Sequence, residues 1–169
     1  MNSVLPPYIV PVAKLVLSDQ VGEWCKLPYP GHPKGCPNYG KADRCPPLAP
    51  HVSDFFDVSG PLYLVHSEFD LAGHQAKMKA ANPKWSDRQC RCVLYWQPSS
   101  RKQLKARTTE AMRLTGLDGV AMVPEAMGVN VYATARVSGL ALEPIRGLKT
   151  CRHVALIGVK RGVKQGRLF

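Results

Sequence analysis

The sequence predicts a single α/β or α+β domain: a mixed sheet of about four strands with flanking helices and one long, irregular, cysteine-rich loop. Three observations support this. At 169 residues the chain suits one domain with a substantial hydrophobic core. Apolar, β-branched runs alternate with stretches in which apolar residues recur at helical spacing. No internal repeat or change of composition divides the chain, so one domain is expected over residues 1–169.

Four short runs of β-branched and apolar residues are the candidate strands. Pro11 interrupts the first run and places it near a sheet edge or a bulge, because proline has no N–H to donate. The last run predicts a buried strand and precedes a basic segment, residues 160–169, that we expect to be frayed. The expected strands are Tyr8–Leu17, Pro61–Ser67, Val120–Val123 and His153–Val159.

Polar capping residues and glycines mark the candidate helices. Asp70, Ser86 and Asn130 each stand where a side chain can accept a hydrogen bond from the first turn. Gly116 and Gly139 are placed to end helices. The expected helical segments are a turn over His51–Phe56 capped near Ser53 or Asp54, Leu71–Ala81, Ser86–Trp96, a helix from Ser99 or Ser100 to about Leu114, and Asn130–Ser138.

Residues 24–51, WCKLPYPGHPKGCPNYGKADRCPPLAPH, form the cysteine loop. This segment is too rich in proline and glycine for a helix or a central strand, and it has few large aliphatic side chains to bury. It contains Cys25, Cys36 and Cys45 in the spacing C-x10-C-x8-C. Soft thiolates gathered on such a loop indicate that a bound metal or cluster holds it in shape.

The spacing favours an iron–sulfur cluster, of the 4Fe-4S type, over zinc. Structural zinc usually binds paired C-x2-4-C knuckles, which the cysteine loop lacks. Well-separated cysteines can instead reach different irons of a cubane, and two of the three cysteines precede proline, as in bacterial ferredoxin motifs. Zinc bound by Cys25, His32, Cys36 and Cys45 is the direct alternative, and three free cysteines in an ordered surface loop is the alternative without metal.

Three thiolates leave one iron of a cubane without a ligand from the loop. Cys90, Cys92, Cys151 or His32 could supply the fourth ligand. Otherwise the iron stays open as a Lewis acid that could bind a substrate. The three cysteines outside the loop are more simply explained as buried thiols that pack like small apolar side chains.

Two stretches resemble the motifs of a family of predicted metal-binding proteins. Cys36–Pro47, CPNYGKADRCPP, matches its C-P-x-Y-G motif followed by C-P-P, and Pro124–Leu140, PEAMGVNVYATARVSGL, is similar to its later motif. The resemblance implies a metal or iron–sulfur site at Cys36 and Cys45, with Cys25 as the upstream partner. It implies no particular activity.

A polar group between a predicted strand and a predicted helix is a second candidate site. Glu125 follows the Val120–Val123 run, and Asn130 and Thr134 lie on one face of the next helix. We expect the three side chains to line one cleft, because α/β proteins place functional groups at such junctions. The structural alternative is that Glu125 and Asn130 cap the start of the helix.

Positive charge is concentrated in residues 84–113, where eight basic residues stand against two acidic ones. Trp85, Tyr95 and Trp96 lie among them. Basic side chains that follow phosphates, together with aromatic faces, suit a single-stranded or RNA ligand. The alternative is a solvated helix face with the aromatic rings in the core. The candidate phosphate contacts are Arg101, Lys102, Lys105 and Arg107.

The composition limits the partners and the compartment. Twenty-three basic residues against twelve acidic ones give a formal net charge of +11, which favours nucleic acid or an anionic substrate. No run of about 18 apolar residues is present, so no membrane span is expected. The N-terminus lacks a basic leader, and we expect a cytoplasmic protein whose thiols are reduced.

Two functional hypotheses follow from these observations. The first is a small cytosolic iron–sulfur protein with its cluster on the cysteine loop, acting with a redox partner or in sulfur or nucleobase chemistry. The second is a zinc-stabilised nucleic-acid-binding module that uses the basic 84–113 region. An iron–sulfur enzyme acting on RNA would combine both, so the hypotheses are compatible.

Overall fold

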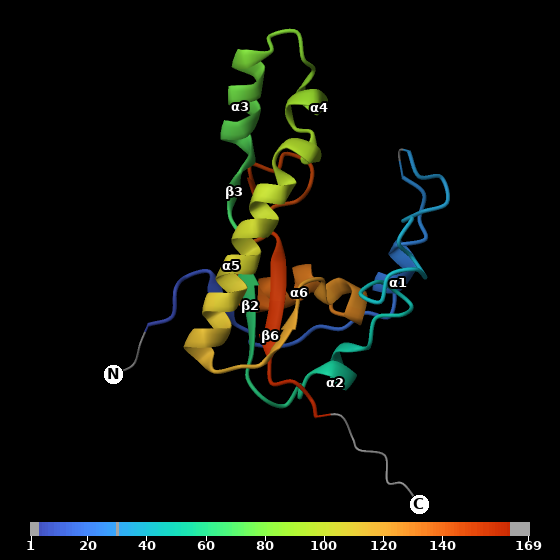
Figure 1. The fold of residues 1–169 in the computed structure, drawn as a ribbon, viewed down its shortest axis with the longest axis vertical. Helices are drawn as coiled ribbons and strands as arrows, with labels where there is room; N and C mark the ends of the chain where they lie inside the picture. Colours follow the sequence, from blue (N-terminus) through green and yellow to red (C-terminus); the bar gives the residue numbers. More distant parts are fainter. Residues whose placement is uncertain (1–3, 30, 163–169) are drawn as a thin grey trace, which may run out of the picture.

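Four strands form the central sheet in the order β1-β2-β6-β4, and every neighbouring pair is antiparallel. The strands are β1 Ile9–Pro11, β2 Leu62–His66, β4 Gly119–Ala121 and β6 Val154–Gly158. The computed structural model describes residues 4–29 and 31–162. The expected class is confirmed as α+β, but the sheet is antiparallel and not mixed, because no neighbouring strands are joined as a parallel pair (Figure 1).

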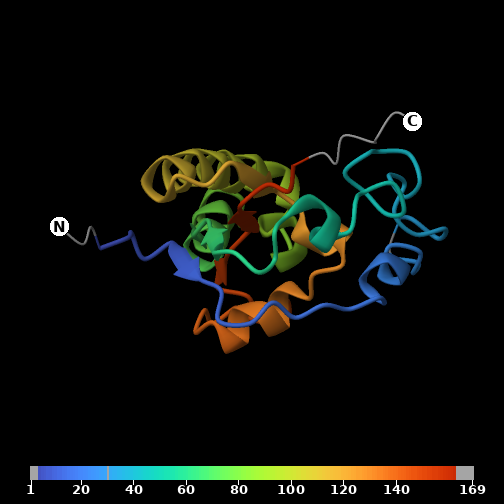
Figure 2. The same cartoon turned by 90° about the horizontal axis from the view of Figure 1, so that it is seen from below.

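Helices cover both faces of this sheet. The 19-residue helix α5, Gln97–Thr115, packs on one face, and α2 (Val52–Phe55) and α6 (Val131–Val137) lie on the other (Figure 2). Side chains alternate accordingly along the central strands. Leu64 of β2 points into the core beneath α2 and α6, whereas Val65 points toward α5. Both strands at the centre of the sheet are therefore buried on both faces.

The first expected strand is shorter than its apolar run. Only Ile9–Pro11 pairs with β2, and the chain then crosses to the α6 side of the sheet. There the Thr134 hydroxyl accepts a hydrogen bond of 3.0 Å from the Val16 N–H. Leu17 forms an isolated bridge with Val129, after which the chain enters a four-residue helix, α1 (Val21–Trp24), that the sequence analysis did not predict.

A projecting arm consists of residues 69–96 together with the returning strand β5, Thr150–Cys151 (Figure 1). In chain order it contains β3 Phe69–Asp70, α3 Leu71–Ala81, α4 Asp87–Cys90 and the 3-10 turn η1 Val93–Tyr95. The Asp70 cap of α3 is confirmed, because its carboxylate accepts the Gly73 N–H at 2.9 Å.

The helix expected from Ser86 to Trp96 is wrong beyond Cys90. Ser86 and Gln89 form the reciprocal cap at its start, but the helix ends at Cys90 and the chain turns. Trp96 is then buried against Phe69, with ring centroids 5.0 Å apart, and its indole N–H donates to the Arg91 carbonyl. Burial of the large indole outweighs continuation of the helix.

The remaining boundaries differ by a few residues. The helix expected from Ser99 or Ser100 begins at Gln97 and ends as predicted before Gly116, whose φ of +71° suits glycine. The cap of α2 is the imidazole of His51, which accepts the Ser53 N–H at 3.3 Å, and not Ser53 or Asp54. Of the expected frayed tail, residues 163–169 lie outside the described residues.

Candidate metal centre

The cysteine loop crosses itself at Cys25 and Cys36. The Cys36 N–H donates a hydrogen bond of 2.7 Å to the Cys25 carbonyl oxygen. Gly35 makes this approach possible: its φ is +83°, and a Cβ atom there would lie 2.6 Å from the same oxygen. The loop otherwise consists of short turns, as its proline and glycine content predicts, and it extends beside α1 and α2 (Figure 1).

The three cysteines of the loop share one electrostatic neighbourhood. Each is half-buried, and none forms a disulfide. Burial raises the pKa of the Cys25 thiol, and negative charge on Cys36, Cys45 and Glu125 raises it further. Because such effects fade with distance, residues separated by 100 positions in the sequence have been brought together at Cys25.

The second motif packs directly against the cysteine loop. It begins with the 3-10 turn η2, Pro124–Met127, which ends at Gly128 with a φ of +89°. A Cβ atom at Gly128 would lie 3.1 Å from the ring of His51, and the Gly128 carbonyl accepts the Ser18 N–H at 2.9 Å. The end of the cysteine loop at His51 and the Pro124–Leu140 stretch are therefore neighbours in space.

The expected cleft residues have different environments. Glu125 lies at the surface beside the loop, where nearby protein displaces water and raises the pKa of its carboxyl group. Asn130 caps α6 by accepting the Ala133 N–H at 3.0 Å. Thr134 is fully buried and bonded to the backbone of Val16. Only Glu125 among the three belongs to the surroundings of Cys25.

The described residues contain no formed metal site. Across residues 4–29 and 31–162, no group of three or more His, Cys, Asp or Glu side chains is arranged to hold a metal ion. Zinc requires four ligands within about 2.0–2.3 Å of one point, so this loop geometry is not a formed zinc site. A cubane also requires its thiolates around one centre, so the loop geometry is not a formed cluster site either.

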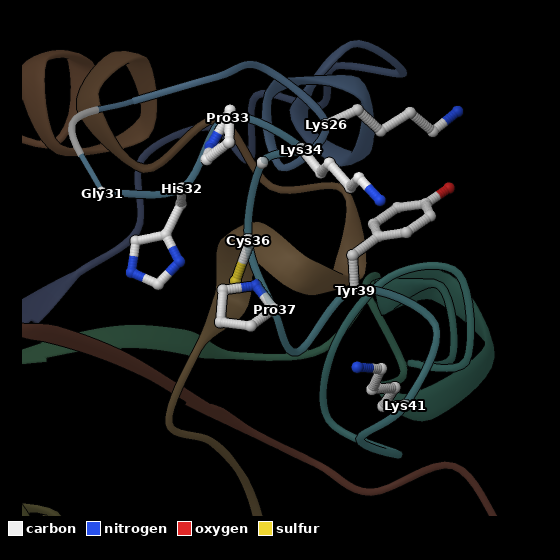
Figure 3. A pocket seen from close by; sticks show the side chains of 10 residues that line it. Lys26, Gly31, His32, Pro33, Lys34, Cys36, Pro37, Tyr39 and Lys41 are labelled. Atoms are coloured by element: carbon white, nitrogen blue, oxygen red, sulfur yellow. The ribbon is translucent and has the colours of Figure 1, made fainter.

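An open cavity of about 410 Å³ lies within the cysteine loop. Cys36 contributes to its wall, as does His32, whose ring packs on Tyr29 with centroids 4.6 Å apart. Figure 3 shows the side chains of Lys34 and Tyr39 on the same side of the loop as Lys26. The sequence analysis did not identify this cluster, although lysines on both sides of Cys36 were a signal for it.

The cysteines outside the loop lie in or next to the arm. Cys90 is fully buried, as expected for a thiol that serves as a small apolar side chain. Cys92 is half-buried beyond the end of α4. Cys151 pairs with Phe69 in the two-stranded sheet, and burial raises the pKa of its thiol. None of the three is among the groups that influence Cys25.

The basic region divides into exposed and structural residues. Arg101, Lys102 and Lys105 are exposed along α5. Arg107 instead donates to the His66 carbonyl oxygen at 2.9 Å and lies 4.6 Å from the centroid of the Tyr8 ring. Its guanidinium therefore joins α5 to the sheet, and we exclude it from a phosphate-binding face.

The aromatic residues of the basic region divide in the same way. Trp96 is only 5% exposed and belongs to the core. Tyr95 is 58% exposed and stacks on Trp85, with ring centroids 5.8 Å apart and an interplanar angle of 23°. One of the three rings therefore lies in the core, and the other two form a stacked pair in which Tyr95 is exposed and Trp85 half-buried.

A buried polar network near the base of the arm was not predicted. Ser100 lies 2.9 Å from Ser67, hydroxyl to hydroxyl, and 2.8 Å from Nδ1 of His153. The Ser67 hydroxyl also accepts the backbone N–H of His153 at 2.9 Å. Both serines are almost completely buried, so the network joins α5 to β2 and β6 and does not present a nucleophile.

Comparisons with family models, with curated proteins and with solved structures found no match. In the described part of the chain, no helix combines the length and the apolar character needed to cross a membrane. The functional argument therefore depends on the geometry of the cysteine loop and on the charge of the surface.

Proposed function

We propose that this protein is a small cytoplasmic iron–sulfur protein whose cluster is held by Cys25, Cys36 and Cys45. The observation that carries the proposal is the crossing of the cysteine loop, where the Cys36 N–H donates to the Cys25 carbonyl oxygen at 2.7 Å. Burial raises the pKa of the Cys25 thiol, and negative charge on Cys36 and Cys45 raises it further. Sulfur ligands that repel one another as thiolates are stabilised when a cationic centre lies among them. A reducing compartment would keep all three available as ligands.

The fit of the residues favours a cluster over a single zinc ion. The donor set is three soft thiols on a loop that has few apolar side chains to order it. His32, the fourth ligand in the zinc alternative, packs its ring on Tyr29. We propose a 4Fe-4S cluster, whose separate irons suit separated thiols, and zinc is the competing outcome.

The residues around the thiols have defined roles in this proposal. Gly35 lets the Cys25 and Cys36 segments cross, and the His51 ring against Gly128 holds the end of the loop on the second motif. Glu125 is near enough to Cys25 for its negative charge to raise the pKa of that thiol. When bound, such a cluster supplies electron transfer with a redox partner, or a Lewis-acidic iron for sulfur or nucleobase chemistry.

Metal and sulfide analysis of protein purified without oxygen tests this proposal. We expect iron and acid-labile sulfide in comparable amounts, with a broad absorption near about 400 nm. Cys25→Ser, Cys36→Ser and Cys45→Ser should each lose most of the iron, whereas the control Cys92→Ser should retain it. A colourless protein containing stoichiometric zinc would reject the cluster.

A second candidate function is binding of single-stranded nucleic acid by the arm and α5. The favouring observation is the Trp85–Tyr95 ring pair, in which Tyr95 is exposed and Trp85 half-buried, with the Lys79 ammonium donating to the Trp85 carbonyl oxygen. Exposed aromatic rings stack on bases, and lysine and arginine neutralise phosphates. Arg101, Lys102 and Lys105 would extend the contact along α5.

Salt dependence tests the second candidate. Affinity for a single-stranded oligonucleotide should fall with salt, with a logarithmic slope of about −0.7 per phosphate contact. Reversal of Arg101, Lys102 and Lys105 to Glu should weaken binding and flatten the slope. The matched control reverses Lys14, Arg136 and Arg161, which are exposed outside the arm and α5. Equal loss in both triple variants would indicate only nonspecific attraction to the net charge.

A further inference from the structure

We propose that the cavity of the cysteine loop binds a small phosphate-bearing ligand, held by Lys26, Lys34 and Lys41 beside the Cys36 thiol. The expected position of the ligand next to a cluster rests on the proposed function. Binding itself requires only the cavity and its charges. The phosphate group would then be the part of a substrate that the protein binds, and the rest of the substrate would lie near the cysteine thiols of the loop.

The cavity has the size and walls of a small-molecule site. Its volume of about 410 Å³ lies within the range of about 300–1,000 Å³ that is typical of ligand pockets. The rings of Tyr39 and His32 form part of its lining, together with Pro33 and Pro37. A flat ring attached to a phosphate could pack on these surfaces while the phosphate contacts the lysines.

The charges that line the cavity are not balanced locally. None of its described lining residues carries a carboxylate. The Lys26 ammonium forms an ion pair of 2.9 Å with Glu23, which is not part of the cavity lining. Hydrogen bonds to Glu23 and to the Tyr39 hydroxyl raise the pKa of Lys26, so its side chain stays charged. No ion pair within the described residues involves Lys34 or Lys41. A concave surface with unpaired ammonium groups attracts anions.

Three lysines around one cavity favour phosphate over a carboxylate as the anion. A phosphate group carries about two negative charges and a carboxylate carries one, so phosphate gains more from several ammonium groups. The lysine ammonium is a compact charge on a flexible stem that can contact any oxygen of a phosphate group. In Figure 3 the Lys26 and Lys34 side chains extend toward the side of the Tyr39 ring, and Lys41 lies on a separate turn of the loop beyond that ring. A bound phosphate would draw these flexible side chains toward it.

The backbone beneath the lysines is tightly held. Lys34 directly precedes Gly35, where the chain crosses the Cys25 segment, and the Cys36 N–H bond to Cys25 follows. The Tyr39 N–H donates to the Cys36 carbonyl oxygen at 3.1 Å. The cavity wall is therefore ordered by the same contacts that place two of the thiols.

Calorimetric titration of the full chain with inorganic pyrophosphate and with ADP tests the proposal. Both should bind, and a double variant, Lys34→Gln with Lys41→Gln, should weaken both by at least about tenfold, because two charged contacts to the phosphate are lost. Lys14→Gln with Lys160→Gln removes the same charge from exposed positions outside the cavity and should leave binding unchanged. Tighter binding of ADP would identify a nucleotide, and equal binding would identify phosphate itself.

Several results would overturn the inference. The inference is wrong if neither pyrophosphate nor ADP binds, or if the two double variants lose the same affinity. It is also wrong if malonate binds as tightly as pyrophosphate, or if the protein binds an oligonucleotide but neither small ligand. Iron analysis of the same samples separates the two proposals. Cavity-dependent binding without iron would overturn the cluster alone, and iron without cavity-dependent binding would overturn the ligand site alone.

Thiol protection provides a readout that does not depend on iron. Cys36 lines the cavity and Cys45 does not. In protein stripped of metal by a chelator, pyrophosphate should slow alkylation of Cys36 relative to that of Cys45, as followed by mass spectrometry of peptides. The Lys34→Gln, Lys41→Gln variant should lose this difference. Equal rates with and without pyrophosphate in the parent protein would contradict the proposed site.

Discussion

Gly35 lies directly against the carbonyl oxygen of Cys25, so that any Cβ atom at position 35 would come within 2.6 Å of it. The next residue donates its N–H to that same oxygen. The crossing brings the first and second cysteine segments together, although ten residues separate the two cysteines in the sequence. A single glycine therefore controls whether the cysteine loop can close.

Gly35→Ala should disrupt the loop more than an equivalent change elsewhere in it. Gly40 has a similar φ of +70° but nothing within 4 Å of its ideal Cβ position, so Gly40→Ala introduces only backbone strain. We expect about 1–2 kcal/mol of strain for each variant. The clash with Cys25 adds to this only at position 35, and iron content should fall more in that variant. Equal iron content in the two variants would contradict the role of the crossing.

Thr134→Val should destabilise the fold. The buried hydroxyl accepts the Val16 N–H, and its loss would leave that donor unsatisfied at a cost of about 1–3 kcal/mol. Ser138→Ala is the control, because its bond with Ala13 is exposed and water can replace it, at a cost of about 0.5 kcal/mol or less. Urea unfolding monitored by circular dichroism measures both, and a neutral Thr134→Val would contradict the expectation.

Trp96 and Tyr95 are adjacent in sequence but should respond oppositely to truncation. Trp96→Ala removes a buried ring that stacks on Phe69, and we expect a loss of about 3–5 kcal/mol in stability. Tyr95→Ala removes an exposed ring and should change stability by about 0.5 kcal/mol or less while weakening oligonucleotide binding. Thermal unfolding and a binding titration distinguish the two effects. If Tyr95→Ala binds the oligonucleotide as tightly as the parent protein, the Tyr95 ring does not stack on a base.

The buried His66 and the half-buried His153 should make the protein less stable in mild acid. Burial lowers the pKa of His66 and of His153, and for His153 the charge of Arg101 lowers it further. Below the ordinary value of 6.5 the unfolded chain therefore binds more protons than the folded one. The free energy of unfolding should fall as the pH decreases from 6.5 through the two folded-state values.

The histidine variants measure this linkage. His153→Asn retains a polar partner for Ser100 but cannot bind a proton in this range, and it should flatten the dependence of stability on pH. Urea unfolding at several pH values between about 5 and 7 gives the slope. A variant with the same slope as the parent would show that acid acts through other groups.

Much of the fold could be predicted from local patterns. The caps at Asp70 and Asn130 and the terminator Gly116 act within one turn of the chain, so their effect is visible in a short window of sequence. The apolar runs that became β2 and β6 were recognisable because both strands are buried on both faces. Their antiparallel pairing was not recognisable, because a run of apolar residues carries no direction.

The failed expectations involved long-range contacts. The helix expected to continue to Trp96 ends at Cys90, because the Trp96 indole stacks on the ring of Phe69. Arg107 of the 84–113 basic region is not available for phosphate, because its guanidinium donates a hydrogen bond to the His66 carbonyl oxygen. In both cases the deciding partner lies far away in the sequence, where periodicity and propensity do not register it.

The sequence alone determined the class of the fold, the location of the cysteine loop and the residue types available there, since these follow from composition and local spacing. Only the tertiary structure decided that Glu125 and Gly128 lie against this loop, that Asn130 and Thr134 serve the fold, and that lysines surround a cavity beside Cys36. The physical reason is that the charge and packing around a thiol come from segments that approach it through space.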